Sequence, residues 1–268
     1  MSATGSTGSE EYTPTEMMTI TASRALSSSD VCFVGIGAPS AACNLARLTH
    51  APGITLIYES GTIGTCPDVL PLSIGDGELA VTALTTVSVP EMFRYWLQGG
   101  RITVGFLGGA QIDRFANINT TVIGSYDDPK TRLPGGGGAP EIAVLCQQIF
   151  VTMKQSSRSF VPAVDFVTSL GFGRTGMERA ALGLTTKGPT RVMTDLCVLE
   201  PEPGTNELVV TALHAGVERS VVSKVTGWPL RFADNCTDNP PPTAEELAVL
   251  RALHERTARA HRTAGSND

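Results

Sequence analysis

An apolar run, a glycine turn, a helix and a second apolar run follow one another near the start of the chain. Val31–Val34 is apolar and ends at Gly35-Ile36-Gly37. Pro39 then favours the start of a helix, and Ile54–Tyr58 is the next apolar run. Short apolar runs that alternate with helices are typical of a parallel sheet covered on both faces. The pattern therefore predicts an α/β fold with an open, mostly parallel sheet flanked by helices.

The same alternation continues through the middle of the chain. It predicts helices over Pro90–Gln98 and Pro140–Gln147. It predicts strands over Arg101–Leu107, Asn119–Gly124, Ile149–Met153 and Val164–Thr168. The last third departs from this pattern, with a predicted hairpin of Arg191–Leu199 and Glu207–Leu213, a short helix over Val217–Val225 and a stiff spacer over Asn239–Pro242.

Capping residues predict where two further helices begin. Thr13 and Glu16 form a capping box with Pro14 at the first helical position. Thr243 and Glu246 form a second capping box. The helix that follows it carries three leucines on one face, namely Leu247, Leu250 and Leu253.

Composition predicts a globular protein. The chain has 268 residues, of which 41% are hydrophobic and 17% are charged. We expect one domain over residues 13–262, a disordered polar tail over 1–12 and a frayed tail over 263–268.

Charge, hydropathy and residue types exclude several classes of function. The net charge of −6 argues against a nucleic-acid partner. No apolar run is long enough to span a bilayer, and the polar N-terminus does not resemble a signal peptide, so no membrane partner is expected. The six cysteines form no C-x-x-C pair, which predicts reduced thiols and a cytoplasmic location. The four histidines show no H-E-x-x-H spacing, so no metal site is expected.

Glu59 is the most informative single residue. It follows the apolar run Ile54–Tyr58 directly and precedes Ser60 and Gly61. Ligands of open α/β sheets bind at the carboxyl ends of the strands. A carboxylate at that place is a candidate nucleophile, general base or cation ligand, although a solvent-facing residue at the end of a strand is the simpler interpretation.

Two glycine-rich segments are candidates for binding an anion. Gly135–Gly138 precedes a predicted helix, and its N–H groups can approach an anion or a developing oxyanion closely. A flexible surface loop is the alternative interpretation. Gly35-Ile36-Gly37 suggests a dinucleotide site with Glu59 as the ribose ligand, but Ser40 stands where the third glycine belongs. A nicotinamide oxidoreductase is therefore an alternative on motifs alone.

Several longer segments together resemble a known family. They are Val34–Ser40, Ile57–Gly61, Leu70–Glu78, Phe93–Arg101, Gly109–Arg114, Asn117–Thr121, Leu133–Glu141 and Thr194–Cys197. On these segments the chain resembles the beta subunit of family I coenzyme A transferases, of the glutaconate CoA-transferase type. The resemblance runs from about Thr15 to about His261 and implies the CoA-transferase fold.

The resemblance implies a role for each matched segment. Glu59 would be the nucleophile that forms an acyl-glutamyl anhydride and then a glutamyl-CoA thioester. Gly137 and Gly138 would supply the oxyanion donors, although the family's run commonly has another residue where this chain has Gly136. Coenzyme A would be a co-substrate rather than a tightly bound cofactor. The positions expected to contact it are Gly35, Gly37, Gly109 and Ala139.

The resemblance also implies a partner and substrates. An alpha subunit would complete the active site in a heterodimer or heterotetramer. The substrates would be succinyl-CoA and 3-oxoadipate, in the degradation of aromatic compounds, or another dicarboxylic acid such as glutaconate. A CoA-ester hydrolase of the same superfamily is the second enzymatic possibility, and an acyl-CoA binding subunit without turnover is the non-enzymatic one.

Overall fold

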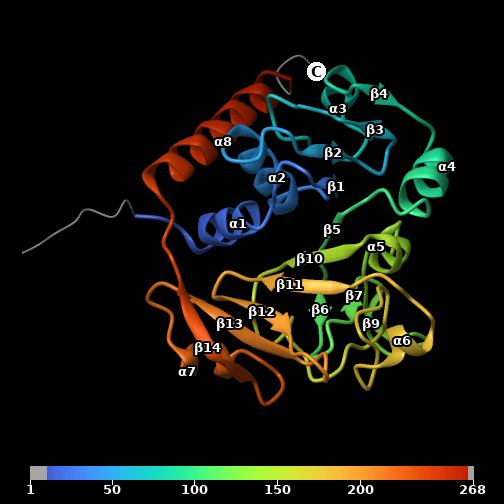
Figure 1. The fold of residues 1–268 in the computed structure, drawn as a ribbon, viewed down its shortest axis with the longest axis vertical. Helices are drawn as coiled ribbons and strands as arrows, with labels where there is room; N and C mark the ends of the chain where they lie inside the picture. Colours follow the sequence, from blue (N-terminus) through green and yellow to red (C-terminus); the bar gives the residue numbers. More distant parts are fainter. Residues whose placement is uncertain (1–10, 265–268) are drawn as a thin grey trace, which may run out of the picture.

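The computed structural model describes residues 11–264, and the rest of the predicted tails over 1–12 and 263–268 lies outside the described residues. A ten-stranded sheet forms the centre of the fold (Figure 1). In chain order its strands are β1 (Val31–Phe33), β2 (Thr55–Ile57), β3 (Thr62–Ile63), β4 (Thr85–Thr86), β5 (Val104–Leu107), β10 (Gln148–Thr152), β11 (Pro189–Met193), β12 (Cys197–Pro201), β13 (Leu208–His214) and β14 (Arg231–Asn239).

The sheet is mostly parallel, as predicted. Its strands lie in the order β14-β13-β12-β11-β10-β5-β1-β2-β3-β4. Strands β3 and β12 run antiparallel to both of their neighbours, and the remaining strands share one direction. Two small antiparallel ribbons lie outside this sheet, formed by β6 (Gln111–Ile112) with β7 (Ile118–Asn119) and by β8 (Val122–Gly124) with β9 (Pro129–Arg132).

Helices pack against the central strands from both sides, because successive side chains of a strand face opposite ways. Cys32 and Leu56 pack into the core that also holds residues of α1 and α2, whereas Phe33 and Ile57 pack into the core shared with the π-helix η1 and with α5. The helices are α1 (Pro14–Arg24), α2 (Ala38–Leu48), α3 (Gly77–Val81), α4 (Val89–Glu91), η1 (Met92–Leu97), α5 (Ala139–Leu145), α6 (Glu178–Ala181), α7 (Arg219–Lys224) and α8 (Ala244–Ala264).

The three leucines predicted to share one face of α8 are buried. They pack with residues of α1 and α2 in a small apolar cluster of Ile20, Ala41, Leu45, Leu70, Leu247, Leu250 and Leu253. The ion pair of Arg24 with Glu246 (2.6 Å) holds the start of α8 against α1. The predicted capping box of Thr13 and Glu16 is also present at the start of α1. Within the described residues, no helix is long and apolar enough to cross a bilayer.

Several predicted strands are wrong in extent or absent. Val164–Thr168 is a loop whose apolar side chains are partly exposed, such as Val167 at 44%, so they do not form a buried sheet face. Asn119–Gly124 is divided into the end of β7 and β8 by a turn in which Asn119 Oδ1 accepts from the Thr121 and Val122 N–H groups. Arg191–Leu199 is likewise divided into β11 and the start of β12.

Strand β14 is absent from the sequence prediction. It contains Asp234, Asn235 and Asp238, which are residue types depleted in strands. Its pairing with β13, in which Asp238 lies opposite Leu213, supplies the hydrogen bonds that local propensity does not predict. The predicted hairpin before it is confirmed as β12 and β13.

The chain order places a crevice at the centre of the sheet. From β1 the chain passes through α2 to β2 on one side, whereas from β5 it passes through α5 to β10 on the other side. The helices that leave β1 and β5 therefore diverge, and ligand sites of open α/β sheets lie where this happens, beyond the carboxyl ends of the strands. Figure 1 shows β1, β2 and β5 side by side at this point.

We expect Leu253→Ala to lower the free energy of unfolding by about 2–5 kcal/mol, because Leu253 is fully buried in the α8 cluster. Leu84→Ala is the matched control, since Leu84 is 85% exposed and its loss is expected to cost less than about 0.5 kcal/mol. Urea denaturation measures both values. Equal effects of the two substitutions would contradict the packing of α8 described above.

Candidate active site

Glu59 lies just beyond the carboxyl end of β2, in the crevice of the sheet. The preceding residue, Tyr58, is fully buried, and its phenol shares a hydrogen bond with Ser40 Oγ at 2.8 Å. Burial raises the pKa of the Tyr58 phenol, so the group stays neutral. Glu59 itself is half-buried and makes no hydrogen bond or ion pair with any described residue, so its carboxylate is available to a ligand.

Gly61 allows the sharp turn that follows Glu59. Its φ of +105° lies in the region that favours glycine. The Gly61 N–H donates to the Tyr58 carbonyl (3.0 Å), and the Val87 N–H donates to the Gly61 carbonyl (2.9 Å). A side chain at position 61 would overlap the Val87 carbonyl oxygen. The turn therefore requires glycine at this position.

The four glycines Gly135–Gly138, called the glycine loop below, are held at both ends. The Gly135 N–H donates to the Thr120 carbonyl at 2.8 Å, and the Ala139 N–H donates to the Gly136 carbonyl at 2.9 Å. Gly135 and Gly137 have φ values of +102° and +50°. These bonds fix the loop between the β7–β8 segment and α5, so it is not the free surface loop that its composition also allowed.

The glycine loop lies directly against Glu59. A Cβ atom placed on Gly138 would be 2.9 Å from Glu59 Oε1, and one placed on Gly137 would be 3.9 Å away. Within the described residues, the N–H groups of Gly137 and Gly138 donate to no protein acceptor. The structure thus brings a free carboxylate beside two free backbone donors, all three from residues that the sequence singled out.

Gly136 is enclosed although it has no side chain. A Cβ atom at this position would lie 3.1 Å from Thr168 Cγ2 and 3.2 Å from Pro140 Cδ and Cγ. Thr168 is itself fixed, because its hydroxyl accepts from the Thr120 N–H (2.9 Å) and bonds to Thr121 Oγ1 (2.7 Å). Neighbouring side chains therefore restrict a loop that four successive glycines would otherwise make flexible.

Glu59 opens onto a cavity of about 220 Å³. Its walls include two predicted CoA contacts, Gly35 and Ala139. The two others lie outside these walls. Gly37 begins α2 and lines a separate groove beside α8, and Gly109 packs against Ile118. The volume is small for a whole ligand and suits the reacting end of one.

Eight of the eleven residues that line the cavity were not among the predicted site residues, and Gly108 and Ile74 illustrate the two reasons. Gly108 follows β5 as Gly35 follows β1, so the rule that sites lie at strand ends would have identified it. Ile74 lies in a loop far from any strand end, and only the tertiary structure brings it to the cavity. Glu59 is the one titratable side chain among the described residues that line this cavity.

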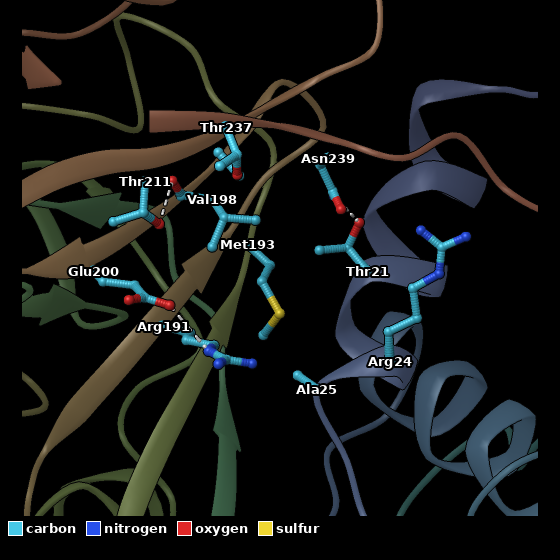
Figure 2. A pocket seen from close by; sticks show the side chains of 11 residues that line it. Thr21, Arg24, Ala25, Arg191, Met193, Val198, Glu200, Thr211, Thr237 and Asn239 are labelled. Carbon is cyan, nitrogen blue, oxygen red and sulfur yellow. Dashed lines mark hydrogen bonds and ion pairs between the residues drawn. The ribbon is translucent and has the colours of Figure 1, made fainter. Parts of the chain in front are cut away.

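A second pocket, of about 320 Å³, lies between α1 and the strands β11–β14 (Figure 2). Its charged groups are already engaged within the chain. Arg191 pairs with Glu200 at 3.1 Å, and Arg24 pairs with Glu246. Because no charge is left uncompensated here, we assign this pocket no catalytic role. Within residues 11–264, no cluster of side chains could hold a metal ion.

The chain is similar to known proteins in sequence and in fold. The family model described as Coenzyme A transferase matches residues 15–224. The beta subunit of the 3-oxoadipate CoA-transferase of Pseudomonas knackmussii is 58% identical over 96% of this chain and 99% of that protein. The beta subunit of the glutaconate CoA-transferase of Acidaminococcus fermentans is 34% identical over 82% of this chain and 84% of that protein. The crystal structure of glutaconate CoA-transferase from A. fermentans superposes with a TM-score of 0.84, at 29% identity, over 90% of this chain and 94% of that chain.

We expect Gly61→Ala to destabilise the fold by at least about 2 kcal/mol, because the new methyl group would meet the Val87 carbonyl at a positive φ. Gly77→Ala is the control, since nothing lies within 4 Å of a Cβ atom at that position. Urea denaturation of both variants tests whether position 61 requires glycine. An unchanged stability of Gly61→Ala would show that the turn after Glu59 tolerates a side chain.

Proposed function

Because the chain belongs to the coenzyme A transferase family, we propose that it is the nucleophile-bearing subunit of a CoA-transferase that moves CoA from succinyl-CoA to 3-oxoadipate. The observation that carries the chemistry is the free carboxylate of Glu59 beside the free N–H groups of Gly137 and Gly138. The choice of acid is supported by the relative that is 58% identical and is named for 3-oxoadipate.

Glu59 acts as the nucleophile. Its carboxylate oxygen attacks the thioester carbonyl of succinyl-CoA, the C–S bond breaks, and an acyl-glutamyl anhydride and CoA thiolate form. The thiolate then attacks the glutamyl carbonyl of the anhydride, which releases succinate and leaves a glutamyl-CoA thioester. The carboxylate of 3-oxoadipate repeats the two steps in reverse, which releases 3-oxoadipyl-CoA and restores Glu59. No proton transfer is required, which fits a cavity that holds no second titratable side chain among its described walls.

The glycine loop stabilises the charge that develops during each step. Every attack on a carbonyl passes through a tetrahedral oxyanion, and fixed donors stabilise it without reorganising. The N–H groups of Gly137 and Gly138 are available to donate because the missing side chains let the backbone approach Glu59 Oε1 closely. The bonds from Gly135 and Ala139 hold these donors in place before substrate arrives.

Coenzyme A acts as a co-substrate, and a second chain completes its site. The cavity of about 220 Å³ holds the reacting thioester but not the pantetheine and nucleotide of CoA. These parts therefore lie outside it, on the chain surface and on a partner. Both relatives are named as one subunit of their enzyme, which supports an alpha subunit as the partner here, in a heterodimer or heterotetramer. All six cysteines are free, which supports a cytoplasmic enzyme of aromatic catabolism.

We expect Glu59→Ala and Glu59→Gln to lower CoA transfer at least about a thousandfold, because each removes the nucleophile. The wild-type chain with its alpha partner and succinyl-CoA, without acceptor acid, should accumulate the glutamyl-CoA thioester. Borohydride then converts Glu59 to the alcohol, and peptide mass spectrometry detects one oxygen replaced by two hydrogens. Glu141→Gln is the control, since Glu141 is an exposed acid on α5. Near-normal transfer by Glu59→Ala would disprove the assignment.

The isolated chain is expected to transfer CoA poorly, because its own cavity is too small to bind CoA. Titrating the alpha subunit into it, with transfer measured at each ratio, should raise the rate until the two chains are present in a fixed ratio. Full activity of this chain alone would rule out a shared site.

A further inference from the structure

Phe93 lies in an unusual turn next to the site. The Gln98 N–H donates to the Phe93 carbonyl at 2.8 Å, and the Arg101 N–H donates to the Trp96 carbonyl at 3.0 Å. Both are bonds between residues five apart, as in a π-helix, and such turns are rare and concentrate at functional sites. Met92 and Leu97, also five apart, are both fully buried and fix this turn in the core.

The Phe93 ring meets Glu59 across Gly138. A Cβ atom on Gly138 would be 2.5 Å from Phe93 Cζ and 2.9 Å from Glu59 Oε1. The edge of the Phe93 ring and the Glu59 carboxylate therefore both lie next to Gly138. The same ring packs edge-to-face with Phe33, at 6.0 Å between centroids, and Phe33 lines the Glu59 cavity.

Few side chains around Glu59 can form a hydrogen bond with a water molecule. Phe33, Ile74, Phe106, Leu107 and Ile142 contribute apolar side chains to the cavity walls. Within the described residues, no histidine, lysine or arginine lines the cavity, so it offers no second side chain to activate a water molecule. Phe93 is not itself among these walls, but its ring packs on the wall residue Phe33 and lies beside the Glu59 carboxylate at Gly138.

Exclusion of water matters because the proposed intermediates are hydrolysable. Water can add to the glutamyl carbonyl of the thioester, after which the C–S bond breaks and the Glu59 carboxylate is regenerated. One proton of the water then protonates the CoA thiolate and the other is released. This reaction consumes the acyl-CoA without transfer, so a transferase must disfavour it relative to attack by an acid.

We propose that Phe93 determines the outcome of the reaction: its ring fills the space beside Glu59 at Gly138 and keeps water from the glutamyl intermediates, so that CoA passes to an acid rather than to water. This role rests on the proposed function. Phe93 reacts with nothing itself; it acts by filling the space beside the carboxylate.

The test is the ratio of hydrolysis to transfer in Phe93→Ala, assayed with the alpha subunit. Hydrolysis is CoA release from succinyl-CoA without acceptor, and transfer is formation of 3-oxoadipyl-CoA with acceptor. We expect the ratio to rise roughly tenfold or more, because the lost ring opens the space beside Glu59 to water. Phe93→Leu keeps part of the apolar volume and should raise the ratio less. A change that merely loosened the fold would lower both rates together.

Phe232→Ala is the matched control. Phe232 is also half-buried, but it lies on β14 and its ring faces the Arg219 guanidinium at 4.9 Å, away from the glycine loop. The ratio of hydrolysis to transfer in Phe232→Ala should stay at the wild-type value. An equal rise in Phe232→Ala, or an unchanged ratio in Phe93→Ala, would overturn the role of Phe93 while transfer by the wild-type enzyme leaves the proposed function intact.

Two further outcomes are decisive. Absence of transfer by the wild-type pair would overturn the proposed function and the role of Phe93 with it. If Phe93→Ala lost its fold by circular dichroism, Phe93→Leu would decide the role by the same ratio, since leucine preserves an apolar side chain there.

Discussion

Parallel pairing of β1 with β2 and β5 fixes where the helices and the candidate site lie. Cys32 pairs with Leu56 and Val104, so the three strands are in register; β1 and β2 end together, and β5 continues past them to Leu107. Both faces of these strands are buried, which gives them their continuous apolar sequences. Because parallel strands need crossover helices, α2 and α5 diverge from this point and leave a crevice between them. Every proposed reacting group reaches that crevice from the end of a strand or the start of a helix.

The geometry of the site depends largely on glycines, which have no side chain. Glycine at 61 permits the turn that presents Glu59, and glycine at 138 lets the backbone, the carboxylate and the Phe93 ring approach one another. Such positions contribute little burial of their own, and within the described residues the Gly138 N–H has no protein acceptor. The stability they lack comes from surrounding elements, such as the Thr168 contacts that restrict the glycine loop and the buried leucines of α8. The packed residues around the site thus hold the glycine positions in place while the site stays accessible.

The cavity beside Glu59 bears on two properties: the binding of CoA by this chain alone and the access of water to the proposed intermediates. Under the proposed function, its volume of about 220 Å³ receives only the reacting end of an acyl-CoA, and the rest of the molecule is bound outside it. Its walls are apolar and, among the described residues, hold no second titratable side chain, which in the proposed mechanism favours attack by a positioned thiolate or acid over attack by water. In the proposed mechanism, transfer and hydrolysis compete for the same glutamyl thioester, and the apolar contacts beside Glu59 favour transfer.

The sequence alone predicts the central α/β unit, the capped helices, the carboxylate that follows β2 and the glycine run before α5, because each depends on local patterns of hydrophobicity, capping and glycine. It did not determine β14, whose Asp and Asn residues form a strand only through pairing with β13, nor the loop over Val164–Thr168, whose apolar side chains stay partly exposed. The packing of distant segments places Ile74, but not Gly37 or Gly109, at the cavity, and brings Phe93 next to Glu59 across Gly138. These contacts join segments far apart in the chain, and their distances follow from how the helices pack on the sheet, which no local pattern encodes.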